Sequence, residues 1–408
     1  MSSKTGIWIF GAKGGLAATV MVGGRAIARE LTSSAGLVTE MEEMGGLGLI
    51  SFGDLIFGGY DIRASSLYDN AYEIYKETGS ISFEILHTLK EEIGAIDREI
   101  KPGFTLNCGR SIERLAEAAF VADETSLAET ISVIGRDIEA FKAGNGLDRV
   151  IAVNLASTEP LLELEDCHND LDLLRGVIER DERSKVRASL LYAYGAIDVG
   201  CPFINFTPSN TALIPAVEQL AAERGVPYMG NDGKTGETLV KSALAPMFKY
   251  RNLKVLSWQG YNILGDRDGM VLSDDDNRKA KVLSKDHLLE KILGYPLHTH
   301  VGIDYVASLK DMKTAWDFIH FQGFMDFKMS MQFTWQGCDS ILAAPLVLDM
   351  IRLADFASRK GESGRMLQLS SFFKSPIGVD EHDLHFQFHA LVNYMAEHLG
   401  KPPGGHHD

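Results

Sequence analysis

The chain has 408 residues, which is enough for two domains with sizeable hydrophobic cores. Its 45% hydrophobic and 24% charged residues are typical of a globular protein in water. The formal net charge of −16 disfavours binding to nucleic acid or to anionic membranes. The sequence has neither the ~18–20 consecutive apolar residues of a transmembrane helix nor a secretory signal pattern, so we expect a cytoplasmic protein.

The first predicted strand, residues 6–10, runs into a glycine-rich turn at residues 11–18 (GAKGGLAA) and then a helix over 16–30. This is a relaxed dinucleotide-binding pattern, in which glycines allow a tight turn and let the backbone approach a pyrophosphate at the helix N-terminus. An acidic residue that binds the ribose is usual ~20 residues later. Glu30 and Glu40 stand near that distance, but neither ends an evident strand.

Strands and helices go on alternating through the first half of the chain. The predicted strands are 149–154, 202–205 and 226–228, and the predicted helices are 110–123, 126–145, 183–197 and 212–224. A further helix is expected to begin within residues 234–241, after a second glycine-rich turn. This alternation predicts a parallel sheet with crossover helices. The cysteines Cys108, Cys167, Cys201 and Cys338 are scattered, which favours reduced thiols over disulfides or a zinc site.

After about residue 240 the pattern changes to strands at 253–261, 299–305, 314–321 and 326–335, before a helix over 341–359. Met329, Met331 and Phe333 alternate with polar residues, and we expect this apolar row to need a partner surface. The predicted fold is α/β: a Rossmann-type doubly wound parallel sheet with an inserted, sheet-rich α+β domain. The expected boundaries are 1–238 for the first part of the nucleotide-binding domain, 239–339 for the insertion and 340–408 for the return.

Several segments together resemble the inositol-1-phosphate synthase (myo-inositol-3-phosphate synthase) family. Their order in the chain matches the family from residue 11 to residue 376. They are 58–62 (GGYDI), 154–160 (NLASTEP), 230–236 (GNDGKTG), 261–269 (YNILGDRDG), 279–285 (KAKVLSK), 338–345 (CDSILAAP) and 372–376 (FFKSP).

The resemblance implies an isomerase that uses NAD catalytically. Such an enzyme oxidises the C5 hydroxyl of glucose 6-phosphate, forms an enolate at C6, closes the ring on the C1 aldehyde and returns the hydride. The product is inositol phosphate, a precursor for phospholipid biosynthesis. The resemblance also implies a homo-oligomer, expected to be a tetramer, and leaves open a divalent or monovalent cation as a second cofactor.

By resemblance, site residues fall on this sequence as follows. The catalytic set is Lys281, Lys285, Lys313, Lys374, Asp232 and Asp339. The NAD-binding set is Gly11, Ala12, Gly14, Gly15, Leu16, Asp61, Ser157, Thr158 and Asp268. The substrate phosphate is assigned to Thr235, Gly236 and Lys285, and no residue is assigned to a metal. A lysine considered without such context is far more often an exposed surface charge, and Asp339 alone would predict a helix N-cap.

Some features leave alternatives open. Asp266 and Arg267 stand where the family commonly has two asparagines, which favours a related cyclase acting on another hexose phosphate as the second hypothesis. A catalytically silent NAD-binding sensor is the third hypothesis, and the lysine set argues against it.

Two groups of histidines could suggest a metal site: His298 with His300, and His382 with His385 and His389. We interpret both groups as structural or surface histidines, because no further ligand stands at a fitting spacing.

Overall fold

The computed structural model describes residues 3–123, 125–265 and 288–402. A seven-stranded sheet forms the larger body, with strand order β11-β6-β5-β4-β1-β2-β3 and parallel pairing throughout. Its strands are β1 (Thr5–Phe10), β2 (Leu55–Asp61), β3 (Ile100–Pro102), β4 (Arg149–Asn154), β5 (Phe203–Asn205), β6 (Pro227–Met229) and β11 (Gly364–Arg365). The predicted Rossmann-type sheet is confirmed.

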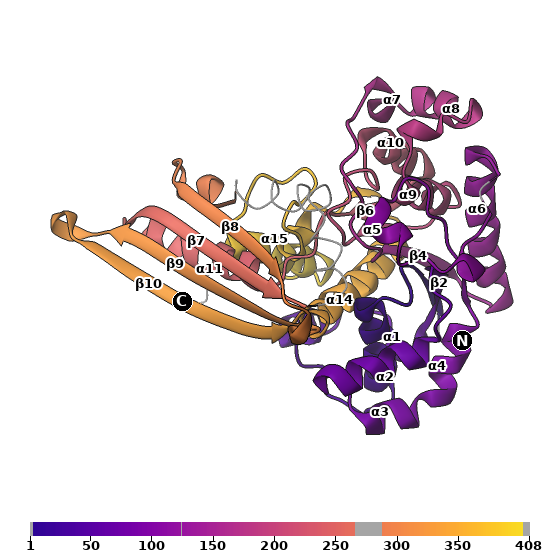
Figure 1. Cartoon of the computed structure of the whole chain (residues 1–408), viewed down its shortest axis with the longest axis horizontal. Coiled ribbons are helices and arrows are strands. Elements are labelled where there is room, and N and C mark those ends of the chain that lie inside the picture. The colour runs from indigo at the N-terminus through magenta and orange to yellow at the C-terminus, as the bar shows by residue number, and fades with distance from the viewer. Residues whose placement is uncertain (1–2, 124, 266–287, 403–408) are drawn as a thin grey trace.

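Helices cover both faces of this sheet (Figure 1). Two separate apolar clusters fill the two interfaces, which is the layering of a doubly wound fold. One face carries α1 (Gly15–Ala28), α2 (Leu67–Thr78), α3 (Phe83–Thr88), α4 (Lys90–Asp97), α14 (Asp339–Arg359) and α15 (Leu384–His398). The other carries α6 (Leu127–Gly144), α7 (Asp166–Asn169), α8 (Leu171–Glu179), α9 (Ala188–Asp198) and α10 (Pro215–Arg224).

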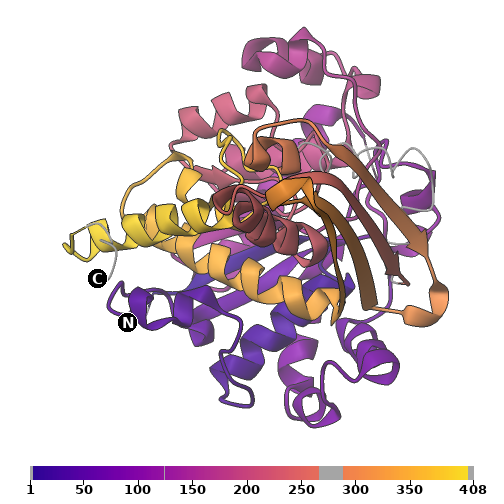
Figure 2. The same ribbon diagram turned by 90° about the vertical axis from the view of Figure 1, so that its left-hand side faces the viewer.

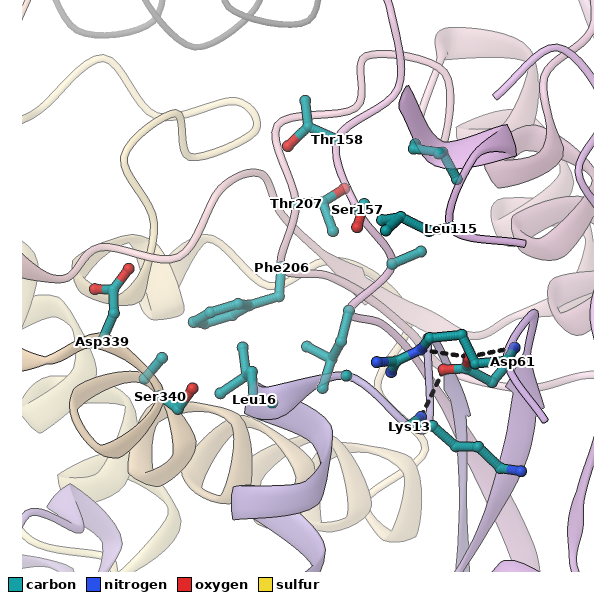
Figure 3. A pocket seen from close by; sticks show the side chains of 18 of the residues that line it. Lys13, Leu16, Asp61, Leu115, Ser157, Thr158, Phe206, Thr207, Asp339 and Ser340 are labelled. Atoms are coloured by element: carbon teal, nitrogen blue, oxygen red, sulfur yellow. Dashed lines mark hydrogen bonds and ion pairs between the residues drawn. The ribbon is translucent and has the colours of Figure 1, made fainter. Parts of the chain in front are cut away.

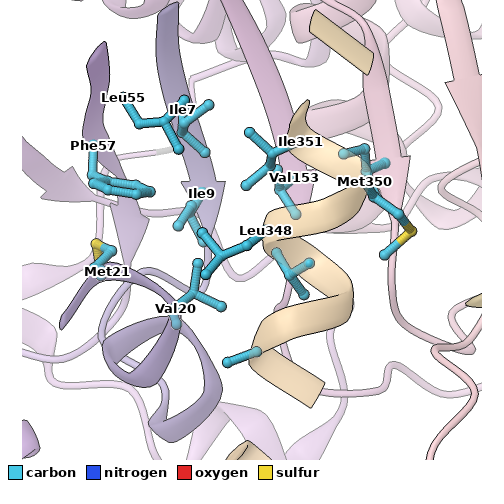
Figure 4. Close-up of a cluster of buried hydrophobic side chains, with 14 of the residues drawn as sticks. Ile7, Ile9, Val20, Met21, Leu55, Phe57, Val153, Leu348, Met350 and Ile351 are labelled. Carbon is cyan, nitrogen blue, oxygen red and sulfur yellow. The ribbon is translucent and has the colours of Figure 1, made fainter. Parts of the chain in front are cut away.

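Helix α14 brings the chain back to the first sheet after the inserted strands. Its Leu348 and Ile351 point toward side chains of β1, β4 and α1, whereas Met350 lies on the other side of the helix within the same apolar cluster (Figure 4). Gly24 of α1 permits this close packing, because a Cβ there would lie 3.3 Å from Leu348 Cδ2. The N-terminal strand and the C-terminal quarter of the chain therefore share one hydrophobic core.

The second sheet has four strands in the order β10-β9-β7-β8, with β7 and β8 parallel and the other pairs antiparallel. Its strands are β7 (Lys254–Leu264), β8 (His298–Tyr305), β9 (Met312–Gln322) and β10 (Lys328–Cys338), as predicted apart from the end residues. Helix α11 (Gly236–Tyr250) covers one face, where Phe248, Trp258 and Ile319 are buried together. Figure 2 shows the strands curving over this helix. The predicted division of the chain at residues 239 and 339 stays a prediction.

One expectation is wrong in detail. The predicted helix over 110–123 ends after one turn, α5 (Arg110–Glu113), because the following backbone pairs with other segments: the Glu117 amide donates to Ile62 O and the Ala122 amide to Gly103 O. Of the apolar row that was expected to need a partner surface, Met331 and Phe333 pack partly against the apolar cluster beneath α11, whereas Met329 is 37% exposed, and a partner for this row stays a prediction. Across the described residues, no helix combines the length and apolar character needed to span a bilayer.

Candidate active site

A cavity of about 570 Å³ lies at the carboxyl ends of the parallel strands, where the first sheet faces the second. The loops that follow β1, β2, β4, β5 and β6 all contribute to its wall. In Figure 3, Asp61 and Asp339 lie at opposite ends, with Leu16, Phe206 and Ser157 between them. From β1 the sheet continues through β2 and β3 on one side and through β4, β5 and β6 on the other, so the strand order reverses between β1 and β4. Ligands of open α/β sheets bind at such a switch point.

The glycine-rich turn forms the floor of the cavity. Gly11 has φ +83°, and a Cβ on it would lie 2.8 Å from Ala156 Cα, so this position requires glycine. Gly14 is the N-cap of α1 and makes no side-chain cap, which leaves the amides at the start of the helix open to a ligand. Gly15 and Leu16 line the cavity, whereas Ala12 is buried behind the turn and its amide donates to Tyr60 O.

Asp61 ends β2 and lines the cavity at the position where a ribose-binding carboxylate is expected. Its Oδ2 accepts the Lys13 amide at 2.6 Å, and its Oδ1 accepts the amides of Ile62 and Arg63. The spacing argument for Glu30 and Glu40 is wrong: Glu30 is exposed beyond the end of α1, and Glu40 pairs with Arg352. Because the connection between α1 and β2 is long, the carboxylate at the end of the second strand is Asp61 rather than Glu30 or Glu40.

These features fit a dinucleotide. The helix N-terminus offers amides to a pyrophosphate, Asp61 stands beside the turn, and Ser157 and Thr158 line the wall after β4. The next residue, Glu159, is buried at the edge of the cavity, where its carboxylate accepts from the Ser189 amide, Ser189 Oγ and Thr211 Oγ. Burial raises the pKa of Glu159. This carboxylate was not predicted, and it fixes the loop that carries Ser157 and Thr158.

Asp232 and Lys374 meet in the cavity although 142 residues separate them. Lys374 Nζ lies 2.8 Å from Asp232 Oδ1, and both side chains are almost completely buried. Their backbones are joined as well, since the Lys374 amide donates to Asp232 O at 2.7 Å. Asp232 Oδ2 has no hydrogen-bond partner among the described residues. The pair therefore places one ammonium and one carboxylate oxygen at a fixed point of the site.

The start of α11 lies in the same cavity, where it has open backbone amides and a nearby cation. Thr235 is its N-cap without a side-chain cap, so the first amides of the helix are open. Lys313 lies beside it, because a Cβ on Gly236 would be 3.6 Å from Lys313 Nζ. Asp339 completes the group: its Oδ2 is 3.7 Å from Lys313 Nζ and its Oδ1 accepts from Thr235 Oγ at 3.4 Å.

The N-cap interpretation of Asp339 is wrong. Helix α14 begins at Asp339 itself, and its N-cap is Cys338. The carboxylate instead faces Thr235 and Lys313 across the space between the sheets. The predicted site residues Lys281, Lys285 and Asp268 lie outside the described residues, as do Asp266 and Arg267.

Sequence reasoning missed Asp311, which lines the cavity beside Asp339. Its carboxylate accepts from Cys338 Sγ at 2.8 Å and from Ser340 Oγ at 3.1 Å, and burial raises its pKa. It stands two residues before Lys313, so a scan of acidic neighbours of that lysine could have found it. Lys234 was also missed: it is buried, donates to Gln387 Oε1, and burial lowers its pKa to about 7.

The histidine pair on β8 lies at the exposed edge of the second sheet. The ring of His300 stands 5.4 Å from that of Tyr261, and His298 is exposed. Within the described parts of the chain, no three His, Cys, Asp or Glu side chains gather as metal ligands would. A cation in the site stays a prediction.

Comparisons with known proteins agree with this geometry. The profile of a family described as Myo-inositol-1-phosphate synthase matches residues 5–396. An inositol-3-phosphate synthase of Bacteroides thetaiotaomicron is 32% identical, over 98% of this chain and 96% of its own. This chain belongs to the myo-inositol-1-phosphate synthase family. Its members bind NAD, and the match includes every described segment that lines the cavity.

Solved structures show the same fold. The inositol-3-phosphate synthase of Caenorhabditis elegans superposes with a TM-score of 0.88 at 24% identity, covering 99% of this chain and 87% of its own. A myo-inositol-1-phosphate synthase-related protein of Thermotoga maritima superposes with a TM-score of 0.80 at 23% identity, covering 98% and 100%. The two-sheet architecture is therefore that of the family.

Proposed function

We propose that this chain converts glucose 6-phosphate into inositol phosphate by oxidation, enolisation, intramolecular aldol closure and reduction. One observation carries the proposal: a single cavity joins the glycine-rich turn to the buried Asp232–Lys374 pair and to the phosphate seat at α11. A simple dinucleotide-binding module would not need a buried ammonium–carboxylate pair next to a second anion seat.

NAD, when bound, supplies a hydride acceptor that is regenerated in each turnover. Gly11, Gly14 and Gly15 would hold its pyrophosphate through the turn and the N-terminus of α1. Asp61 would hold the adenosine ribose, and Ser157 and Thr158 would bound the other side. Together these residues would orient the bound cofactor and shield it from water.

Lys374 and Asp232 are proposed to handle charge and protons on the sugar. Negative charge develops on a substrate oxygen in the enolate and again in the aldol alkoxide, and a preorganised ammonium stabilises it most effectively where water is excluded. Lys374 supplies that ammonium. Asp232 orients it through Oδ1, and its Oδ2 can take a proton from the C5 hydroxyl. Lys281 is proposed to act beside Lys374 on the same oxygen.

The substrate phosphate is proposed to bind at the start of α11. Thr235 and Gly236 offer the open amides, and Lys313 adds a cation beside them. Asp339 holds Lys313 in place. Lys285 is proposed to contact the same phosphate. Binding this remote group fixes the position of C5 and C6 against the catalytic pair.

The test is to incubate the protein with NAD and ¹³C-labelled glucose 6-phosphate and to identify the product by NMR. We expect inositol phosphate, with absorbance at the NADH band staying near its baseline. A different carbocycle would show a related cyclase with another product. Unchanged sugar with retained NAD binding would refute the proposed substrate, and repeating the assay with other hexose phosphates would then separate a cyclase for another substrate from a sensor. Stoichiometric NADH would show a dehydrogenase.

The chain is also proposed to form a homo-oligomer, a tetramer, through the second sheet. The sheet face opposite α11 carries a row of neighbouring aromatic rings from Tyr261, Trp316 and Phe318. At the β9–β10 turn, Phe324 and Met325 are 90% and 83% exposed. Exposed apolar side chains gathered on one sheet and its turn favour a protein contact, and a second copy of the chain is the proposed occupant.

A further inference from the structure

Arg63 stands at the ribose end of the cavity and has no role in the reaction described above. It comes two residues after the end of β2, lines the cavity, and its side chain is 12% exposed. An arginine is costly to enclose to this degree unless its donors are used.

The hydrogen bonds around Asp61 show which donors are already used. Asp61 Oδ1 accepts the amides of Ile62 and Arg63 and also Arg63 Nε at 3.2 Å, so its acceptor positions are filled. Asp61 Oδ2 accepts the Lys13 amide and keeps one position for a ribose hydroxyl. Neither Nη nitrogen of Arg63 has a partner among the described residues. Four N–H donors of a fixed, planar cation are thus available beside the position for the ribose.

Among the described residues that line this end of the cavity, Arg63 is the cation whose outer nitrogens have no charged partner. The ammonium of Lys13 turns the other way, 3.7 Å from Asp97 and 4.1 Å from the centre of the Phe120 ring. Lys310, which also lines the cavity, pairs with Glu77 at 2.9 Å. The negative charge of Asp61 is itself offset by the Arg63 guanidinium and by three backbone amides.

In Rossmann-type sites, the acid that ends the second strand binds the ribose 2′-hydroxyl of NAD, whereas a nearby arginine binds the 2′-phosphate of NADP. This chain has both groups. We propose that Arg63 is a specificity-determining residue that binds a 2′-phosphate, so that the site accepts NADP as well as NAD. The inference rests on the proposed function, because it concerns the same dinucleotide site.

Equilibrium binding of NAD and NADP, measured separately by calorimetry, tests the proposal. For the wild-type protein we expect the two dissociation constants to agree within about tenfold. Arg63→Ala removes charge-assisted hydrogen bonds to the 2′-phosphate. It should raise the dissociation constant of NADP at least about tenfold and change that of NAD less than about threefold. Added salt should weaken NADP more than NAD, because the additional phosphate is bound through charge. Arg180→Ala, an exposed arginine paired with Glu182 on the surface, is the matched control.

Retained NAD binding by Arg63→Ala shows that the variant is folded. A dissociation constant of the wild-type protein for NADP more than about tenfold higher than that for NAD would overturn the proposal. Equal loss of both dinucleotides in Arg63→Ala would also overturn it, because Arg63 would then only shape the turn. If the wild-type protein binds no NAD at all, the proposed function itself fails.

Discussion

At the scale of single residues, the Asp232–Lys374 pair is the part of the site most open to direct test. Lys374→Ala should fold and bind NAD but form inositol phosphate more slowly by ~10²–10³, the usual loss for one preorganised electrostatic contact. Asp232→Asn keeps the shape, cannot take a proton, and should be impaired as well. Product formation and NAD affinity are measured for each variant. Exposed Lys142→Ala is the control, and a Lys374→Ala rate equal to that of the control would refute the assignment.

Gly11 provides a second test, directed at the cofactor. Gly11→Ala puts a methyl group 2.8 Å from Ala156 Cα at a φ of +83°, so the turn must move. We expect NAD affinity to fall at least about tenfold by calorimetry, because the pyrophosphate needs the turn in its present position. Gly23→Ala, inside α1 with no heavy atom within 4 Å of the added carbon, is the matched control and should leave NAD affinity unchanged.

Lys234 should make stability depend on pH. Burial lowers the pKa of Lys234 to about 7, below the ordinary value of 10.5, so between these values the unfolded chain binds a proton that the folded chain does not. The unfolding free energy therefore rises with pH in this range, and this gain disappears again as the pH falls towards 7. Compared with Lys234→Met, the wild type should gain up to about 1.4 kcal/mol per pH unit in urea unfolding between pH 7 and 9. A difference that does not change with pH would contradict this.

The residue pairs also mark the limit of prediction from sequence. Motif resemblance identified Asp232 and Lys374, but nothing in their spacing predicts a contact between residues 142 apart, because it depends on how two loops lie across a sheet. Arg63, Glu159 and Asp311 were missed for a related reason. Their roles depend on hydrogen bonds to segments far away in the chain or across a loop, and the hydrophobic periodicity of the sequence does not predict such bonds.

At the scale of helices and strands, the long strongly patterned elements were predictable. Strands β4, β7 and β9, and helices α6 and α14, agree with expectation to within a few residues. Strands β3 and β11 have too few residues to show a pattern. The predicted helix over 110–123 fails because its backbone amides donate to the loops after β2 and β3 rather than within a helix. Tertiary contacts here override local propensity.

The connection between α1 and β2 depends on α14 in a way that can be measured. Buried Asp349 of α14 accepts the amides of Val38 and Thr39 at 2.8 and 3.0 Å and Thr39 Oγ at 2.6 Å. Asp349→Ala leaves these donors enclosed without an acceptor, and we expect a loss of about 3 kcal/mol in unfolding free energy. Chemical denaturation measures this. Asp172→Ala, at a 90% exposed position, should change it by less than about 0.5 kcal/mol.

At the scale of the whole molecule, the open face of the second sheet predicts an assembly. Trp316→Lys places a charge in the middle of the aromatic row and should lower the mass found by light scattering, because a buried unpaired charge opposes association. The wild type should have the mass of a tetramer. Leu173→Lys, at an exposed apolar position on α8, is the control. A wild-type monomer at micromolar concentration would refute the proposed assembly.

The return of α14 and β11 to the first sheet has a consequence for biosynthesis. Ile7 and Ile9 of β1 are covered by Leu348 and Ile351 of α14 (Figure 4), so strands that are synthesised first depend on a helix that is synthesised near the end of translation. Contacts this distant in sequence form slowly and leave apolar surface exposed in the meantime. A ribosome-bound chain that ends before residue 339 would lack both α14 and Lys374. Such nascent chains should bind chaperones and remain sensitive to protease, and catalytic competence should arise only when the last segment is released.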